Sequence, residues 1–306
     1  MNALVGHQEQ KEKLLSMARD QALPTAFIFF GSQGIGKKQL VRGLLQVLNC
    51  QRDIQACGVC SHCVRALETK NEFVFEVGLD GKKNISVESI RELHKFLSLK
   101  TMNAARFVII DPADQLSKAA SNALLKVLEE PPAKTYFFLL TDKLSALLPT
   151  IRSRSQILRF SKLTEEQLKH VKDLSPTAME WSGGRLDYAK QLLEENSINT
   201  LNESLQLFYK LICGEALDWK KEASWFFDDE NEKDFCFHIW NQALEKRLHG
   251  QKNNLEWMPE DEAKLSYLFE RLEDFKSDLN RNVDKLLAME NFYYSLRKDD
   301  KVSLWS

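Results

Sequence analysis

The sequence predicts an α/β domain followed by an all-α region, and three observations lead to this prediction. Up to about residue 160, short apolar runs alternate with helical patterns, which is typical of a parallel sheet covered by helices. After residue 161 the strand signal nearly disappears while helical spacing continues. A glycine-rich turn joins the first apolar run to a helix. The 306 residues are enough for two or three domains of ordinary size.

The local patterns place the individual elements. Strands are expected at residues 26–30, 72–77, 106–111, 136–142 and 156–160. Helices are expected within residues 4–22, at 39–49, from 86, at 117–130, from 164, at 186–194, 265–275 and 286–296. The Trp and Phe side chains beyond residue 200 recur at helical spacing. We therefore expect them to form the core of a helical bundle rather than a stacking platform for bases.

Composition restricts the class of protein. Hydrophobic residues make up 43% of the chain and charged residues 28%, as in globular proteins with real cores. The net charge of −2 provides no global basic field of the kind that marks a nucleic-acid binder. The first residues lack the pattern of a signal peptide, and no apolar stretch is long enough to span a membrane. We therefore expect a cytoplasmic protein with reduced thiols.

The turn at residues 31–37 has the G-x-x-x-x-G-K spacing of a phosphate-binding loop, in the strand–turn–helix context that such a loop requires. Gly31, Gly34 and Gly36 allow positive φ angles and bring backbone N–H groups close to phosphate oxygens. Lys37 would reach the outer phosphates, and the following helix would offer its N-terminal amides. The alternative is a glycine-rich turn that binds nothing.

Two positions depart from a hydrolytic site. A working loop has Ser or Thr after the lysine as a Mg²⁺ ligand, but here Lys38 follows, and a lysine has no lone pair to donate. The buried strand at residues 106–111 ends at Asp111, which suits the water shell of Mg²⁺, yet Pro112 stands where a Glu would activate water. The two losses argue against hydrolysis of ATP by this chain and leave open whether it binds ATP or Mg²⁺ at all.

Four of the six cysteines, Cys50, Cys57, Cys60 and Cys63, fall within one short segment. Four thiolates around a tetrahedral Zn²⁺ form a structural site with no open position for chemistry. The alternatives are a redox C-x-x-C or loosely packed free thiols. His62, between two of these cysteines, could replace one sulfur ligand, but its ring is expected to point to solvent. The single cysteines at 213 and 236 are expected to be core thiols.

These motifs together resemble a known family, the bacterial DNA polymerase III clamp-loader subunits of the AAA+ class. The resemblance rests on residues 31–37, the cysteine quartet, Asp111, the segment 122–132 (Asn-Ala-Leu-Leu-Lys-Val-Leu-Glu-Glu-Pro-Pro) and residues 152–155. It is strong over residues 1–160, fair to about 195 and weak afterwards. It implies an AAA+ α/β domain at 1–162 with a zinc module at about 50–63, a helical lid at 163–200 and a helical collar at 201–306.

Within this family the resemblance separates two kinds of subunit. Gamma/tau motor subunits keep a complete ATP site, whereas delta-prime often has a degenerate one. The double loss, with no long extension beyond the collar, looks like delta-prime. Arg154, in a Ser-Arg-Ser version of the family's Ser-Arg-Cys motif, would be an arginine finger acting in trans on a neighbour's ATP. Thr141 and Arg185 look like the two sensor residues of the nucleotide site.

The resemblance implies the partners. A delta-prime-like subunit would contact gamma/tau-like motor subunits and a delta-like subunit through its AAA+ and collar domains. It would act indirectly on the sliding clamp and on primer–template DNA. The alternative is a gamma/tau-like motor in which Asp114 replaces the missing Glu and Lys38 replaces the metal's charge. A zinc-dependent DNA-binding protein is a more remote reading, because the chain shows no basic, aromatic-studded face.

Overall fold

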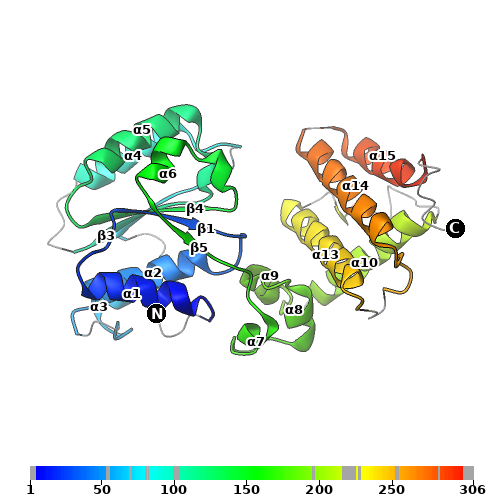
Figure 1. Cartoon of the computed structure of the whole chain (residues 1–306), viewed down its shortest axis with the longest axis horizontal. Coiled ribbons are helices and arrows are strands. Elements are labelled where there is room, and N and C mark those ends of the chain that lie inside the picture. Colours follow the sequence, from blue (N-terminus) through cyan, green and yellow to red (C-terminus); the bar gives the residue numbers. More distant parts are fainter. Residues whose placement is uncertain are drawn as a thin grey trace. The chain divides into compact units, whose positions relative to one another are not determined.

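The chain folds into two compact units. The computed structural model describes residues 5–52, 56–68, 71–79, 81, 83–98, 104–194, 197–215, 225–226, 229–251, 255–281 and 283–298. The first unit comprises Met1–Leu174 with Ser182–Asp187, and the second comprises Ser175–Trp181 with Tyr188–Ser306 (Figure 1). The first unit contains the sheet, and the second is helical where it is described.

The first unit is built on a five-stranded parallel sheet with the strand order β2-β3-β4-β1-β5. The strands are β1 (Ala26–Phe30), β2 (Val74–Val77), β3 (Arg106–Ile110), β4 (Thr135–Thr141) and β5 (Gln156–Arg159). Parallel neighbours require crossover connections, and helices in those connections cover both faces of the sheet. This explains why the central strands are apolar on both sides. The predicted α/β class and all five predicted strands are confirmed.

Helices cover both faces of this sheet (Figure 1). One face packs against α1 (Gln8–Arg19) and α2 (Lys37–Asn49). The other packs against α4 (Val87–Ser98), α5 (Lys118–Glu129) and α6 (Pro149–Ser153). The side chains of β1 alternate between the two layers, since successive residues of a strand point to opposite faces. The short helix α3 (Ser61–Arg65) and the single turns η1 (Ala113–Gln115) and η2 (Leu144–Ala146) lie in the connections.

An aromatic cluster fills the layer between the sheet and α1–α2. Phe138 of β4 is fully buried at its centre. Its ring stacks on Phe27 with 5.3 Å between centroids and packs against Phe107 at 4.6 Å. Phe29 meets it edge to face. The cluster joins three neighbouring strands, so it fixes the sheet as well as filling the core.

The second unit is built from longer helices. They are α10 (Ser197–Cys213), α13 (Glu230–Leu248), α14 (Glu262–Asn280) and α15 (Lys285–Lys298), together with the short α8 (Pro176–Trp181). The short helix α7 (Glu165–Leu168) belongs to the first unit, and α9 (Leu186–Gln191) begins in the first unit and ends in the second. Trp240 is fully buried and stacks on Phe208 and Phe226 at 5.0 and 5.3 Å. The prediction that these aromatic residues form the helical core is confirmed. Among the described residues, no helix has the length and apolar character needed to cross a membrane.

Replacing Phe138 with Ala is expected to lower the free energy of unfolding of the first unit by about 3–5 kcal/mol, because a buried ring is lost and a cavity remains. Phe138→Leu keeps most of the buried apolar surface and is expected to cost clearly less. Urea unfolding followed by circular dichroism measures both. Equal losses in the two variants would contradict a role for the ring cluster.

Candidate nucleotide site and cysteine cluster

The glycine-rich loop lies at the carboxyl edge of the sheet. It leaves the end of β1, and the Gly31 N–H donates to the carbonyl of Thr141 at the end of β4 (3.0 Å). Asp111 follows β3, and its N–H donates to the carbonyl of Val77 at the end of β2 (2.9 Å). Ligands of open α/β sheets bind at this edge, beyond the carboxyl ends of the strands. The parallel register therefore brings the predicted loop, acid and first sensor residue together.

Two of the loop glycines are required by close approaches. A Cβ at Gly31 would lie 2.3 Å from the carbonyl oxygen of Phe160. A Cβ at Gly34, where φ is +73°, would lie 1.9 Å from a carboxylate oxygen of Asp187. Gly36 is the residue before α2, so the helix begins at Lys37, two residues earlier than predicted. The first amides of α2 consequently lie at the loop itself.

Lys37 is buried and bonds to its own loop. Its Nζ donates to the carbonyl oxygens of Gly31 and Ser32, both at 2.5 Å. Burial lowers the pKa of Lys37, and the nearby carboxylates of Asp111 and Asp142 oppose this shift. Two backbone carbonyls thus satisfy an ammonium group that can also contact phosphate.

Lys38 extends to the acids at the ends of β2 and β3. Its Nζ lies 3.2 Å from Oε2 of Glu76 and 3.5 Å from Oδ2 of Asp111. Arg42, one turn further along α2, also pairs with Glu76. Burial raises the pKa of Asp111, whereas Lys38 and then Lys37 oppose this effect. A cation of the chain itself is therefore placed against the carboxylate that the sequence suggested for Mg²⁺.

Asp114, the acid considered as a replacement for the missing Glu, is bonded within the edge of the sheet. Its carboxylate accepts hydrogen bonds from the Thr141 hydroxyl (2.8 Å) and the Gln115 amide (3.1 Å). The Thr141 hydroxyl in turn accepts from the N–H of Lys143 (3.0 Å). Pro112 precedes η1 and has no ionisable group. Thr141, which the sequence suggested as the first sensor residue, is thus tied to Asp114.

Arg185 is paired with an acid of the segment whose backbone contacts the loop. Its guanidinium makes a two-point contact with Asp187, with Nη2–Oδ2 at 2.6 Å and Nε–Oδ1 at 3.1 Å. The N–H groups of Leu186 and Asp187 donate to the carbonyl of Gly34 at 2.8 and 3.3 Å. The segment that carries Arg185, which the sequence suggested as the second sensor residue, is therefore fastened to the loop by two backbone hydrogen bonds.

Sequence reasoning missed four residues of this site: His7, Arg42, Glu76 and Asp187. His7 precedes α1, and its Nε2 lies 2.7 Å from the carbonyl oxygen of Ile35 in the loop. Its ring packs edge to face on Phe160 at 5.0 Å. A lone histidine carries no sequence signal for such a role. For Glu76 the sequence did offer a signal, because a charged side chain within the alternating pattern of β2 indicates a partner or a functional role.

Arg154 lies at the opposite edge of the sheet. Gln156, the first residue of β5, is paired with Phe27 near the start of β1. At ~3.3 Å per residue, the strand from Phe27 to Gly31 spans roughly 13 Å. The Arg154 guanidinium donates to Oε1 of Glu129 at the end of α5 (3.0 Å) and to the carbonyl of Thr150 (3.2 Å), and its side chain is 40% exposed.

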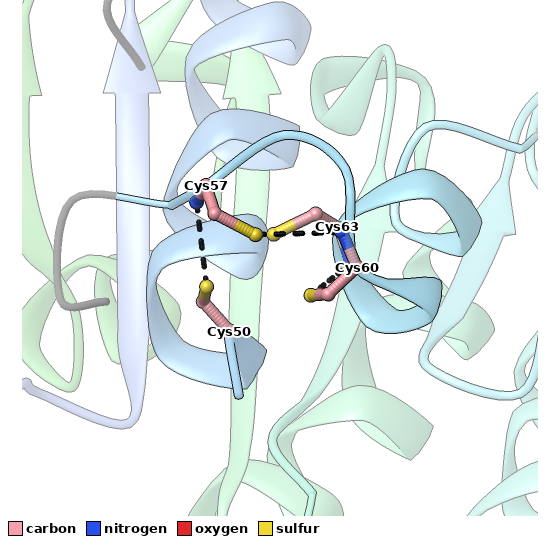
Figure 2. Close-up of side chains that lie close together, drawn as sticks. All are labelled: Cys50, Cys57, Cys60 and Cys63. Carbon is pink, nitrogen blue, oxygen red and sulfur yellow. Dashed lines mark hydrogen bonds between the residues drawn. The ribbon is translucent and has the colours of Figure 1, made fainter. Parts of the chain in front are cut away.

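The four clustered cysteines converge on one point (Figure 2). Cys50 follows α2, Cys60 precedes α3 and Cys63 lies within it. The four sulfur atoms lie within 4.8 Å of one another, and ligands of a tetrahedral Zn²⁺ with ~2.3 Å bonds lie roughly 3.8 Å apart. The N–H of Cys57 points to the sulfur of Cys50 (3.3 Å), and that of Cys60 to the sulfur of Cys57 (3.4 Å). This arrangement could hold a metal ion.

The two single cysteines and His62 differ in how far their side chains are buried. Cys236 is fully buried, as predicted for a core thiol, whereas Cys213 is partly exposed. The expectation that His62 points to solvent is wrong. Its ring is half-buried and stacks on Phe73 with 5.4 Å between centroids. Phe73 lies just before β2, and its ring offers the imidazole an apolar surface that solvent does not.

The strand order, the loop after β1, the acid after β3 and the polar residue that ends β4 define a protein of the AAA+ class. The solved structure of a DNA polymerase III gamma subunit-related protein from Thermotoga maritima has a similar fold. Its TM-score is 0.55 at 18% sequence identity, covering 94% of this chain and 99% of that one. The predicted fold class, with helices following the α/β domain, is confirmed.

The family model described as "DNA polymerase III, delta subunit" matches residues 6–164, and the chain belongs to that family. A DNA polymerase III subunit delta' of Haemophilus influenzae is 31% identical over 195 residues, which are 60% of this chain and 59% of that protein. DNA polymerase III subunit tau of Salmonella typhimurium is 34% identical over 185 residues, 60% of this chain and 28% of that protein. The chain thus spans less than two thirds of these relatives. The resemblance to clamp-loader subunits is confirmed.

The buried His7 is expected to make stability depend on pH. Burial lowers its pKa below the ordinary 6.5, with Lys11 and Lys37 adding to this effect and the Ile35 carbonyl opposing it. The folded state therefore binds fewer protons than the unfolded chain, so the free energy of unfolding should fall as pH drops through and below 6.5.

His7→Gln should remove this part of the pH dependence, because glutamine stays neutral and can still donate to a carbonyl. Urea unfolding at about pH 7.5 and about pH 5.5 measures the effect. His170→Gln, at an exposed histidine, is the matched control and should behave like the native chain. An unchanged pH dependence in His7→Gln would exclude this role.

Proposed function

We propose that this chain is a delta-prime-like subunit of the DNA polymerase III clamp loader, which helps to load the sliding clamp on primed DNA in the cytoplasm. In this proposal its own ATP site is degenerate, and Arg154 acts in trans on the ATP of a neighbouring subunit. The observation that carries the proposal is the position of Arg154, at the edge of the sheet opposite the chain's own loop.

The degenerate site is supported by the partners of its charged groups. Lys38 offers no lone pair to a metal, and its ammonium lies against Asp111 and Glu76. No carboxylate occupies position 112, and Asp114 accepts a hydrogen bond from Thr141. Phosphoryl transfer in P-loop proteins relies on a bound metal and an oriented nucleophile. This chain lacks the hydroxyl ligand after the loop lysine and the Glu after Asp111 that usually serve these two roles.

The action in trans is supported by geometry and exposure. Arg154 precedes Gln156, which pairs with Phe27, and the roughly 13 Å of strand between Phe27 and Gly31 keeps its side chain away from a phosphate bound at its own loop. The exposed ion pair with Glu129 holds Arg154 in place but contributes little to stability, so a phosphate can replace it at low cost. The planar, permanently charged group suits the charge that develops on a transferring phosphoryl group.

The partners proposed are gamma/tau-like motor subunits and a delta-like subunit, with the sliding clamp and primer–template DNA contacted through the assembly. The contacts would be made by an AAA+ domain at residues 1–162 and a collar at 201–306, with a lid at 163–200 between them. We also propose that Cys50, Cys57, Cys60 and Cys63 bind a structural Zn²⁺, because four sulfur ligands leave no open position for chemistry.

A gamma/tau-like motor is the second candidate, and the 34% identity to tau over 185 residues favours it. That reading requires Asp114 to orient the attacking water, whereas Asp114 accepts hydrogen bonds from Thr141 and Gln115. Measurable turnover by the isolated chain would support the motor over the delta-prime reading.

Arg154→Ala is expected to reduce turnover at the neighbouring ATP site by roughly 10³-fold, because an arginine finger contributes this much or more to phosphoryl transfer. The measurement is the DNA-stimulated ATPase of a complex reconstituted with gamma/tau-like and delta-like subunits, clamp and primed DNA. The complex should lose the share of activity that comes from that one site, while gel filtration should show unchanged assembly.

Arg91→Ala is the matched control, because Arg91 is an exposed arginine on α4 with a 71% exposed side chain. It should leave the ATPase unchanged. Full activity of the Arg154→Ala complex, or an equal loss with Arg91→Ala, would refute the finger.

Cys63→Ser is expected to abolish stoichiometric zinc binding, since one of four thiolate ligands is lost. It should also lower the thermal stability of the first unit, because binding to a structural site contributes to folding free energy. Atomic emission measures zinc per chain. Cys213→Ser changes a cysteine outside the cluster and should retain the metal. Zinc-free native protein, or zinc retained by Cys63→Ser, would contradict the site.

A further inference from the structure

We propose that Lys38 is a built-in cation that takes the place of the divalent metal, so that the loop holds a nucleoside triphosphate in its metal-free form. This inference rests on the proposed function, in which the chain does not hydrolyse ATP. It assigns to the degenerate loop a ligand class and to Lys38 a role of its own, rather than treating the substitution as a simple loss.

The first step is the placement of the ammonium group. Lys38 is the second residue of α2, where the side chain of a metal ligand would stand. Its Nζ lies between two carboxylates, 3.2 Å from Glu76 and 3.5 Å from Asp111. These acids come from the neighbouring strands β2 and β3, whose register places their ends side by side. The cation therefore lies where acids of two strands converge.

The second step concerns charge. Glu76 and Asp111 carry two negative charges, and Lys38 and Arg42 place two positive charges against them. Mg²⁺ requires oxygen ligands in near-ideal octahedral geometry. A divalent ion at this point would displace the ammonium and meet the repulsion of Arg42. The negative charges of Glu76 and Asp111 are thus neutralised without a metal.

The third step concerns what remains for an anion. Lys37 is only 6% exposed, and its hydrogen bonds go to the carbonyls of Gly31 and Ser32. A phosphate oxygen is a stronger partner for an ammonium than a neutral carbonyl. The first amides of the thirteen-residue helix α2 face the same loop. The loop therefore retains its anion-binding groups while its metal position is filled by Lys38.

The consequence is binding without turnover. In phosphoryl transfer the metal bridges β- and γ-phosphate oxygens and neutralises developing charge. An ammonium supplies one charge and three donors but no coordination sphere. The nucleotide would then serve as a static ligand that orders the loop, and no bond to phosphorus changes.

Calorimetric titration of ATP into the full chain, in excess EDTA and in excess Mg²⁺, tests the inference. We expect ATP to bind in EDTA and Mg²⁺ not to strengthen the binding. Absence of binding in EDTA would overturn the inference, and so would an affinity that rises about tenfold or more with Mg²⁺, the size expected of one charge-assisted contact. This measurement on the native chain does not depend on any variant folding.

Lys38→Thr supplies the hydroxyl that metal-dependent loops use. It should weaken binding in EDTA by about tenfold and make Mg²⁺ strengthen it. Lys38→Met should weaken binding in both conditions, because it has neither a charge nor a hard ligand. Lys118→Thr is the control, an exposed lysine in the first turn of α5, and should bind as the native chain does. Unchanged binding by Lys38→Thr would overturn the role.

Failure of the Lys38 inference and failure of the proposed function give different results in the two experiments. The Arg154 measurement reads ATP turnover on a neighbouring subunit, whereas the titration reads binding to this chain. A chain that binds no ATP, in a complex that still depends on Arg154, would refute the role of Lys38 alone. A complex indifferent to Arg154 would refute the finger alone.

Discussion

Parallel pairing of all five strands is the constraint on which the rest of the first unit depends. It places every carboxyl end at one edge and every amino end at the other. The glycine loop, Asp111 and Thr141 consequently meet, although they are far apart in the sequence. The same constraint carries Arg154 to the opposite edge, just before β5. One sheet thus separates the groups that would hold a nucleotide from the group proposed to act on another subunit's nucleotide.

The carboxyl edge of the sheet satisfies its charged groups with partners from the chain itself. The ammonium group of Lys37 donates to loop carbonyls, and that of Lys38 lies against Glu76 and Asp111. The guanidinium of Arg185 forms an ion pair with Asp187. Each is a group that a nucleotide or its metal would otherwise contact. Lys37 is buried, and an ammonium group buried without partners would cost several kcal/mol. Internal partners make the loop stable in the absence of a ligand, which suits a subunit whose proposed task is to present Arg154 to its neighbour.

The cysteine cluster shows a different kind of dependence on the sheet. Gln46 of α2 donates to the carbonyl of Cys63 (2.9 Å), and Asn49 exchanges two hydrogen bonds with Ala105 beside β3. These contacts tie the cysteine segment to the core near the end of α2. A metal bound there would therefore brace the helix that begins at the phosphate-type loop. Local cross-linking of this kind stabilises short segments that cannot bury a core of their own.

The sequence by itself determined the strands, the loop and the cysteine cluster, because each depends on local spacing: apolar runs, glycines at fixed offsets and C-x-x-C steps. It also indicated that Lys38 and Pro112 interrupt a hydrolytic site, since side-chain chemistry alone decides whether a group can ligate a metal. Only the tertiary structure decided which groups meet Lys38 and the loop. Strand register and helix packing bring four residues to the site: Glu76, Arg42, Asp187 and His7. Contacts between residues distant in sequence leave no periodic pattern in the sequence, so they could not be predicted from it. The half-buried ring of His62 was misjudged because its stacking partner Phe73 precedes β2, and the sequence does not show how α3 packs against that segment.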